Sequence, residues 1–132
     1  MLINDHHMHP TVYARKVNLV FKAGMQEIEL KARIHTFLSE LTDALKQSGC
    51  ELIGHIKGLI VADGKGHLMF SLTSFEEAAR FQGKLHAGIF RGLLTVNIIV
   101  YGVELNIVET VFQKTFHKYF GQALYRQESN DT

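Results

Sequence analysis

Apolar and polar residues alternate along the first part of the chain and then change to a helical spacing. The alternation covers residues 12–21, for example at Val17 and Leu19, and predicts a β-strand. From residue 26 to 47 the apolar positions recur every three or four residues, which predicts an amphipathic helix. Gly49 is placed to end that helix in a left-handed conformation.

Two strands joined by a tight turn are predicted next. The sequence Asp63-Gly64-Lys65-Gly66 is typical of a hairpin turn between two apolar runs. Because side chains alternate between the faces of a strand, we expect Leu52, Ile56 and Ile60 to share the core-facing side of the first run.

The remaining chain is predicted to form a helix, a strand and a second helix. Ser74-Phe-Glu-Glu77 has the spacing of a capping box and predicts a short helix over residues 75–85. An alternating apolar run predicts a strand over residues 93–103. A final apolar stripe predicts a helix over residues 106–120.

The predicted order β-α-β-β-α-β-α indicates an α+β protein. Two β-α-β halves joined by a hairpin are typical of the ferredoxin-like βαββαβ sandwich, here with an additional C-terminal helix. In that fold the helices cover one face of an antiparallel sheet and leave the other face open. We expect one domain over residues 11–121, after a flexible His-containing lead-in over 1–10 and before a polar tail over 122–132.

The open face of the predicted sheet follows from strand parity. Its expected residues are Lys16, Asn18, Val20 and Lys22 on the first strand, Ile53, His55, Lys57 and Leu59 on the second, His67, Met69 and Ser71 on the third, and Thr95, Asn97, Ile99 and Tyr101 on the fourth. Three uses of this face compete: plain exposure to solvent, self-association around its apolar residues, and a site for a ligand or partner.

Composition and charge exclude several classes of protein. The 132 residues carry 14 Lys and Arg against 13 Asp and Glu, so the net charge of +1 provides no bulk attraction for nucleic acid or anionic lipid. The single Cys50 excludes an internal disulfide framework. No apolar run is long enough for a membrane helix, and the N-terminus lacks the pattern of a secretory signal. We therefore expect a cytoplasmic protein that acts as a homodimer or with a protein partner, without nucleic acid or membrane.

Histidine is frequent, with eight residues in the chain, and divides into two candidate sites. His6, His7 and His9 in the lead-in could hold a divalent transition metal such as copper, nickel or zinc, or could be an unstructured polar segment. His55 and His67 are expected on one sheet face and neighbouring strands, where two imidazoles alone do not make a metal site. The sequence identifies no other cofactor.

Motifs for nucleotide binding, zinc hydrolysis and nucleophilic catalysis do not occur, and this favours a protein that is not an enzyme. The alternative is a small enzyme with an active site at a subunit interface, in which His55 or His67 serves as general base. A concave pocket that joins one of these histidines to a second polar group would favour the enzyme.

Three segments carry a resemblance to a known family. Gly54-His-Ile-Lys-Gly-Leu-Ile60, Leu68-Met-Phe-Ser-Leu-Thr73 and Leu94-Thr-Val-Asn-Ile-Ile-Val-Tyr-Gly102 resemble strands in the C-terminal region of CobW-type GTP-dependent metal chaperones. The chain has no GTPase domain, so GTP hydrolysis is not implied. The resemblance implies an accessory module in metal or corrinoid metabolism, with partner contacts on the open face that we assign to His55, Lys57, His67, Asn97 and Tyr101.

Overall fold

The computed structural model describes residues 9–121 and 124–127 of the chain. Its elements are β1 (Pro10–Met25), α1 (Glu27–Gln47), β2 (Leu52–Ala62), β3 (Gly66–Leu72), β4 (Arg80–Leu85), β5 (Ile89–Tyr101), α2 (Leu105–Phe120) and β6 (Leu124–Gln127). The predicted first strand, both long helices and the hairpin are present, and Gly49 after α1 has a φ of 107°.

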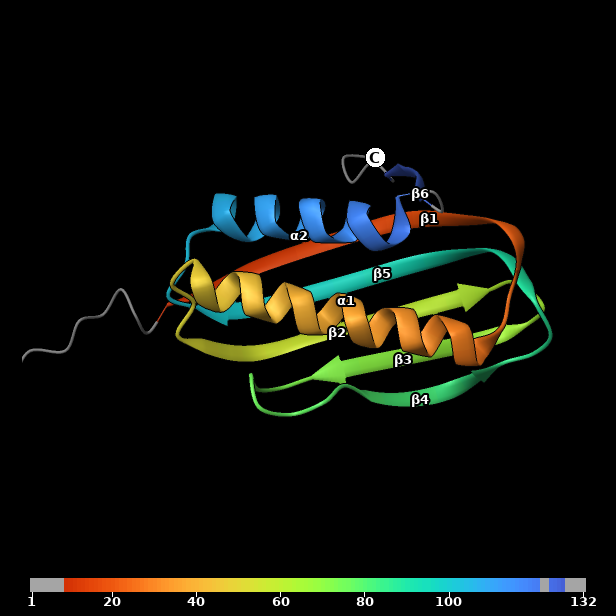
Figure 1. The fold of residues 1–132 in the computed structure, drawn as a ribbon, viewed down its shortest axis with the longest axis horizontal. Coiled ribbons are helices and arrows are strands. Elements are labelled where there is room, and N and C mark those ends of the chain that lie inside the picture. Colours follow the sequence, from red (N-terminus) through yellow and green to blue (C-terminus); the bar gives the residue numbers. More distant parts are fainter. Residues whose placement is uncertain (1–8, 122–123, 128–132) are drawn as a thin grey trace, which may run out of the picture.

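The strands form one antiparallel sheet in the order β4-β3-β2-β5-β1-β6. Both helices lie against the same face of this sheet, α1 across its middle and α2 along β1 (Figure 1). The opposite face carries no helix in the described part of the chain. The prediction of an α+β protein with an antiparallel sheet and one open face is therefore confirmed. Neither described helix combines the length and the apolar character needed to cross a membrane.

The predicted helix over residues 75–85 is wrong, because this segment contains the edge strand β4. Residues 80–85 pair with β3, and Phe81 and Leu85 turn toward the core. Gly83 has a φ of 96°, which lies outside the helical region. The hydrogen bonds with β3 therefore outweigh the local capping pattern, which favoured a helix. With β4 added beside β3, the strand order does not confirm the ferredoxin-like topology.

The predicted parity of β2 fails at its first residues. The ladder with β5 shifts register between Ile53 and His55, so Gly54 forms a bulge. As a result Leu52 is 56% exposed, although we expected it in the core, and Ile53 is buried, although we expected it on the open face. From His55 onward the predicted parity holds, because Ile56 and Ile60 are buried.

Aromatic side chains fill the space between the helices and the sheet. The Phe37 ring of α1 packs edge-on against Phe112, Phe116 and Phe120 of α2, with centroid distances of 5.8, 5.7 and 5.7 Å. The Tyr13 ring of β1 lies 5.3 Å from Phe112. Phe112 therefore joins three elements of the fold at one point.

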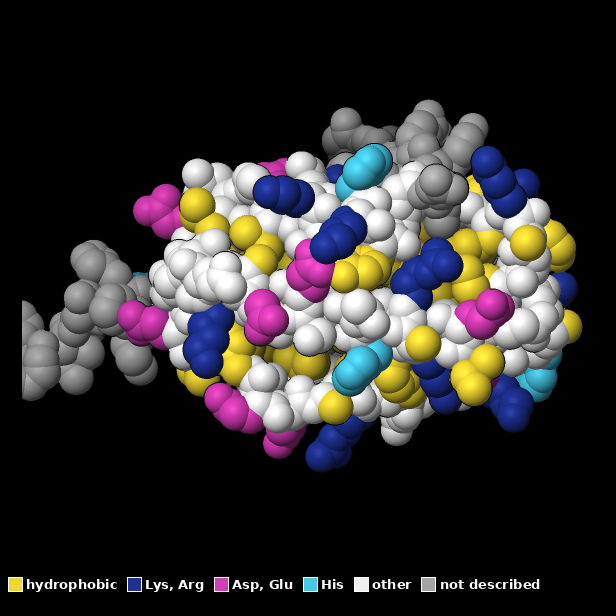
Figure 2. All heavy atoms as spheres, in the orientation of Figure 1, with side chains coloured by type: hydrophobic (Ala, Val, Ile, Leu, Met, Phe, Trp, Pro, Cys, Tyr) yellow, Lys and Arg dark blue, Asp and Glu magenta, His cyan; other side chains and the backbone are white. Residues whose placement is uncertain are grey.

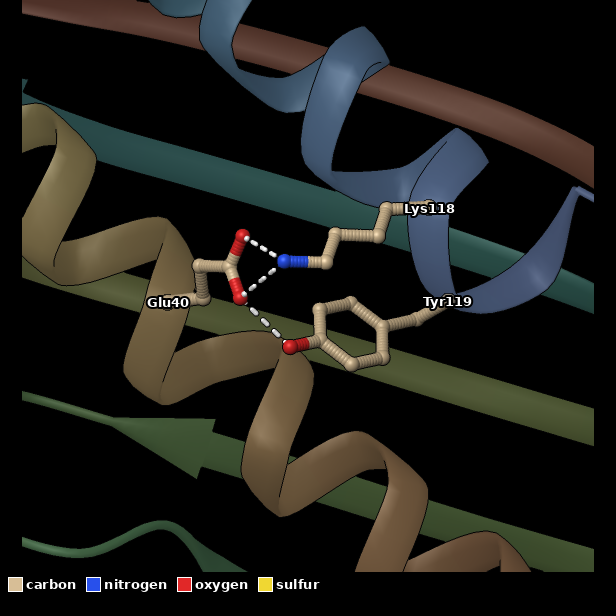
Figure 3. Close-up of polar contacts among 3 residues, drawn as sticks. All are labelled: Glu40, Lys118 and Tyr119. Carbon is tan, nitrogen blue, oxygen red and sulfur yellow. Dashed lines mark hydrogen bonds and ion pairs between the residues drawn. The ribbon is translucent and has the colours of Figure 1, made fainter.

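A polar contact also connects the two helices, as Figure 3 shows. Lys118 Nζ donates hydrogen bonds to both carboxylate oxygens of Glu40, at 3.0 and 2.9 Å, and the Tyr119 hydroxyl donates to Oε1. The hydrogen bonds from Tyr119 and Lys118 hold the pKa of the Glu40 carboxyl below its ordinary value. The same carboxylate raises the pKa values of Lys118 and Tyr119.

This contact predicts a pH-dependent contribution to stability. A carboxyl whose pKa is lower in the folded protein stabilises the fold above its ordinary pKa of 4.5 and loses that effect as the pH falls further. We expect Glu40→Gln to lower the midpoint of urea unfolding at neutral pH, and the difference from the native protein to shrink toward about pH 3. A difference that stayed constant over this range would show that the Glu40 charge has no part in it.

Candidate functional site

The open face of the sheet carries all five residues that the sequence analysis assigned to partner contacts. Lys57 of β2 lies directly opposite Asn97 of β5, so these two side chains are cross-strand neighbours. His55 lies opposite Ile99, one step further along the same pair of strands. Tyr101 follows Ile99 on this face, and its ring lies 3.4 Å from the position that a Cβ on Gly54 would take. These four residues therefore share one half of the face.

His67 belongs to the other half of the open face. It lies opposite Val61 on β2, six residues from His55, which corresponds to about 20 Å along a strand. The two histidines thus lie on one face and on neighbouring strands, as expected, but the register keeps them out of any common site. Strand parity is readable from the sequence, whereas position along the neighbouring strand is not.

The structure provides no metal centre among the residues it describes. No three His, Cys, Asp or Glu side chains of this part come together in a way that could hold an ion. His9 is exposed directly before β1, whereas His6 and His7 lie outside the described residues. The lead-in metal site therefore stays a prediction.

A hollow of about 800 Å³ lies on the open face, over the ends of β1, β5 and β2. Its lining includes Asn18, Val20, Val61, Asp63, Arg91 and Leu93. A shallower hollow of about 510 Å³ adjoins it across Val61 and Asp63, and its lining includes Leu59, His67 and Met69. The first volume lies within the range of about 300–1,000 Å³ that is usual for ligand pockets.

Apolar side chains form the floor of the two hollows. Val61 and Met69 keep 43% and 42% of their surface exposed, and Leu59 and Leu93 are half-buried. The ladder places these four on adjacent strands, because Val61 pairs with Leu93 and Leu59 pairs with Met69. Neighbouring apolar residues that remain open to solvent typically mark a contact surface.

Arg91, Asp63 and Leu93 were not among the site residues predicted from the sequence. We expected the strand that contains Leu93 to begin at residue 93, but β5 begins at Ile89 and carries Arg91 onto the open face beside Val20. Asp63 was assigned only to the hairpin turn. The signal that could have found Arg91 is the apolar pair Ile89 and Phe90 directly before it.

Cys50 lies away from these hollows, directly after the turn that follows α1. Its side chain is buried, and burial raises the pKa of the thiol. A thiol that stays protonated near neutral pH is a poor nucleophile, so Cys50 is typical of a structural cysteine.

Comparison with known proteins assigns the chain to no family. No family model matches the chain, and no curated protein matches it. Two solved structures of the YjiA GTPase resemble it, the Zn(II)-bound protein from E. coli and a Zn(II)-bound triple mutant. Both share 14% sequence identity over 79% of this chain, with TM-scores of 0.37 and 0.38 respectively. YjiA is a CobW-family GTPase, and this chain spans 29% of the length of those two chains.

Proposed function

We propose that the protein is a non-enzymatic binding module that receives a partner protein on its open sheet face. The observation that carries this proposal is the apolar floor of the two hollows, on the one side of the sheet without a helix among the described residues. In a single antiparallel sheet the face away from the helices normally carries polar side chains. Here Leu59, Val61, Met69 and Leu93 replace them at adjacent positions.

The half of the face around Lys57 and Asn97 supports the same proposal. Lys57, Asn97 and Ser71 form one row across three strands, next to the row of Leu59 and Met69. Such an arrangement has the apolar centre and polar margin of a protein interface. The sequence resemblance to CobW-type proteins suggests which system the module serves, namely metal or corrinoid metabolism.

The alternative, an enzyme with a histidine base, has one observation in its favour. His67 and Asp63 line the same shallow hollow. However, no hydrogen bond joins these two described side chains, so Asp63 does not orient the imidazole as a catalytic partner would. Loss of a measured hydrolytic or isomerase activity in His67→Gln, with unchanged folding, would favour the enzyme.

Binding of an uncharged apolar dye tests the proposal. We expect Nile red to bind the folded protein with increased fluorescence, because the dye can cover the apolar floor without needing a charge partner. Val61→Glu places a carboxylate on that floor and should weaken dye binding by about tenfold or more, since burying an unpaired charge is costly.

Ile28→Glu is the matched control, because Ile28 is also an exposed aliphatic residue but lies on α1, at 77% exposure. Near-ultraviolet circular dichroism establishes that both variants keep their packed cores. Equal dye binding by the two variants would contradict the proposal, because the dye would then bind elsewhere.

A further inference from the structure

Acidic residues are distributed unevenly in the fold. The six described strands contain no aspartate or glutamate, although the chain has nearly as many acids as bases. The acids of the described residues occur in the helices and the connecting segments, and on the helix side of the molecule they are interspersed with Lys and Arg (Figure 2). The net charge of +1 for the whole chain therefore does not show that the described strands carry only basic charges.

Five bases of β1 to β5 lie at paired positions on the open face, and we call them the basic set. They are Lys16, Lys57, Arg80, Lys84 and Arg91, which are all exposed. Their positions follow from the ladder, because Arg80, Lys84 and Lys57 pair with Ser71, His67 and Asn97, while Lys16 and Arg91 pair with Thr95 and Val20. Arg15 is not a member, since it turns to the helix side and lies 3.9 Å from Glu109.

The basic set surrounds the apolar floor. Arg91 lines the larger hollow itself, and Lys84 lies opposite His67 at the far side of the smaller one. Lys16 and Lys57 lie one strand position from Asn18 and Leu59, respectively, counted along the same face. Asp63 is the acid that lines both hollows. Several bases around apolar side chains make a surface that is complementary to an apolar group with negative neighbours.

This charge distribution selects among the possible occupants. Two copies joined face to face would bring their basic sets together, which costs energy through like-charge repulsion. A nucleic acid would need several aromatic rings close together on which bases can stack. Among the described residues of β1, β2, β3 and β5 on this face, the rings are Tyr101 at one end and the imidazoles of His55 and His67, which the register keeps about 20 Å apart along the strands. A bilayer would need protruding apolar groups, whereas here they line hollows.

We infer that the segment seated on the open face is an acidic amphipathic segment of a partner protein. This inference rests on the proposed function and names its partner class. Apolar side chains of the segment fill the hollows over Val61 and Leu93, and its carboxylates meet Arg91, Lys57 and the other members of the basic set. Electrostatic attraction of this kind increases the rate of association and selects against basic partners.

Synthetic helical peptides test the inference with the full chain. One peptide carries leucine on one face and glutamate on the other, a second replaces every glutamate by glutamine, and a third replaces it by lysine. We expect fluorescence anisotropy to detect binding of the glutamate peptide alone. Binding should weaken between about 0.01 M and about 0.15 M ionic strength, as the screening length falls from about 30 to about 8 Å.

Charge reversal locates the binding. The double variant Lys57→Glu and Arg91→Glu should weaken binding of the glutamate peptide by about tenfold or more at about 0.15 M ionic strength. The matched control reverses one arginine and one lysine on the helix layer, Arg33→Glu and Lys114→Glu, both exposed. At this ionic strength the screening length is about 8 Å, so the control should leave the affinity within about twofold, because its charges are on the opposite side of the sheet. Equal weakening by both double variants would overturn the inference.

The remaining outcomes separate this inference from the proposed function. If the glutamine and glutamate peptides bind equally well and Val61→Glu weakens both, the open face is a docking surface and the acidic partner class is wrong. If no peptide binds but Nile red does, the inference is again overturned while the hollow stands. Loss of both peptide and dye binding overturns both proposals. A single-stranded oligonucleotide or an anionic vesicle that binds in place of the glutamate peptide overturns the inference.

Discussion

Replacing Phe112 by alanine is expected to destabilise the protein by about 3–5 kcal/mol, the usual cost of removing a buried phenylalanine. Phe112 is 2% exposed, and its ring contacts those of Tyr13, Phe37 and Phe116. The cavity would therefore lie where β1, α1 and α2 meet. Because a domain is typically stable by about 5–15 kcal/mol in total, this single change removes a large part of the free energy of unfolding.

Urea unfolding followed by circular dichroism measures this effect. We expect the midpoint to fall while the slope of the transition stays the same, because the surface exposed on unfolding hardly changes. Ile28→Ala serves as the control, since Ile28 is largely exposed and its truncation should alter stability by less than about 0.5 kcal/mol. A cost below about 1 kcal/mol for Phe112→Ala would mean that the aromatic side chains rearrange to fill the space.

The contrast between Phe112 and Phe81 explains how far the sequence predicts this fold. Phe112 belongs to a stripe repeated over four turns of α2, and such long periodic signals predict an element from local information. Phe81 lies in a six-residue edge strand whose conformation depends on pairing with β3, and the local capping pattern at Ser74 indicated a helix instead. Short segments that are defined by their neighbours lie beyond sequence reasoning of this kind.

The candidate site also has features that the sequence predicts and features that it does not. Parity placed Lys57, Asn97 and Tyr101 on the open face, because alternation along a strand is a local property. The separation of His55 from His67, and the nearness of Arg91 to Val61, depend on the register between strands and on where β5 begins. The absence of acids from the described strands was visible in the sequence, but it has meaning only once the strand boundaries are known.

Gly58 is a buried residue of β2 whose two chain neighbours lie on the open face. We expect Gly58→Ala to destabilise the protein by about 1–3 kcal/mol through overpacking. Gly58 pairs with Phe70, and a Cβ at this position would lie 2.1 Å from the Phe70 ring. Phe70 is 4% exposed and cannot turn away into solvent. The gain of about 0.4–1 kcal/mol that alanine brings by restricting the unfolded chain is smaller than this cost.

A double-mutant cycle distinguishes the clash with Phe70 from a general intolerance of β2 to substitution. Phe70→Leu makes room for the new methyl group, so Gly58→Ala should cost less in that background, with a coupling energy of about 0.5–3 kcal/mol. Gly64→Ala is the control, because Gly64 has a φ of 74° and nothing within 4 Å of its Cβ position, so its cost comes from the backbone alone. Phe70→Leu should leave that cost unchanged, and equal rescue at both glycines would contradict the role of the ring. Lys57 and Leu59 flank Gly58 on the open face, so displacement of β2 by the clash should also weaken Nile red binding, and Phe70→Leu should restore it.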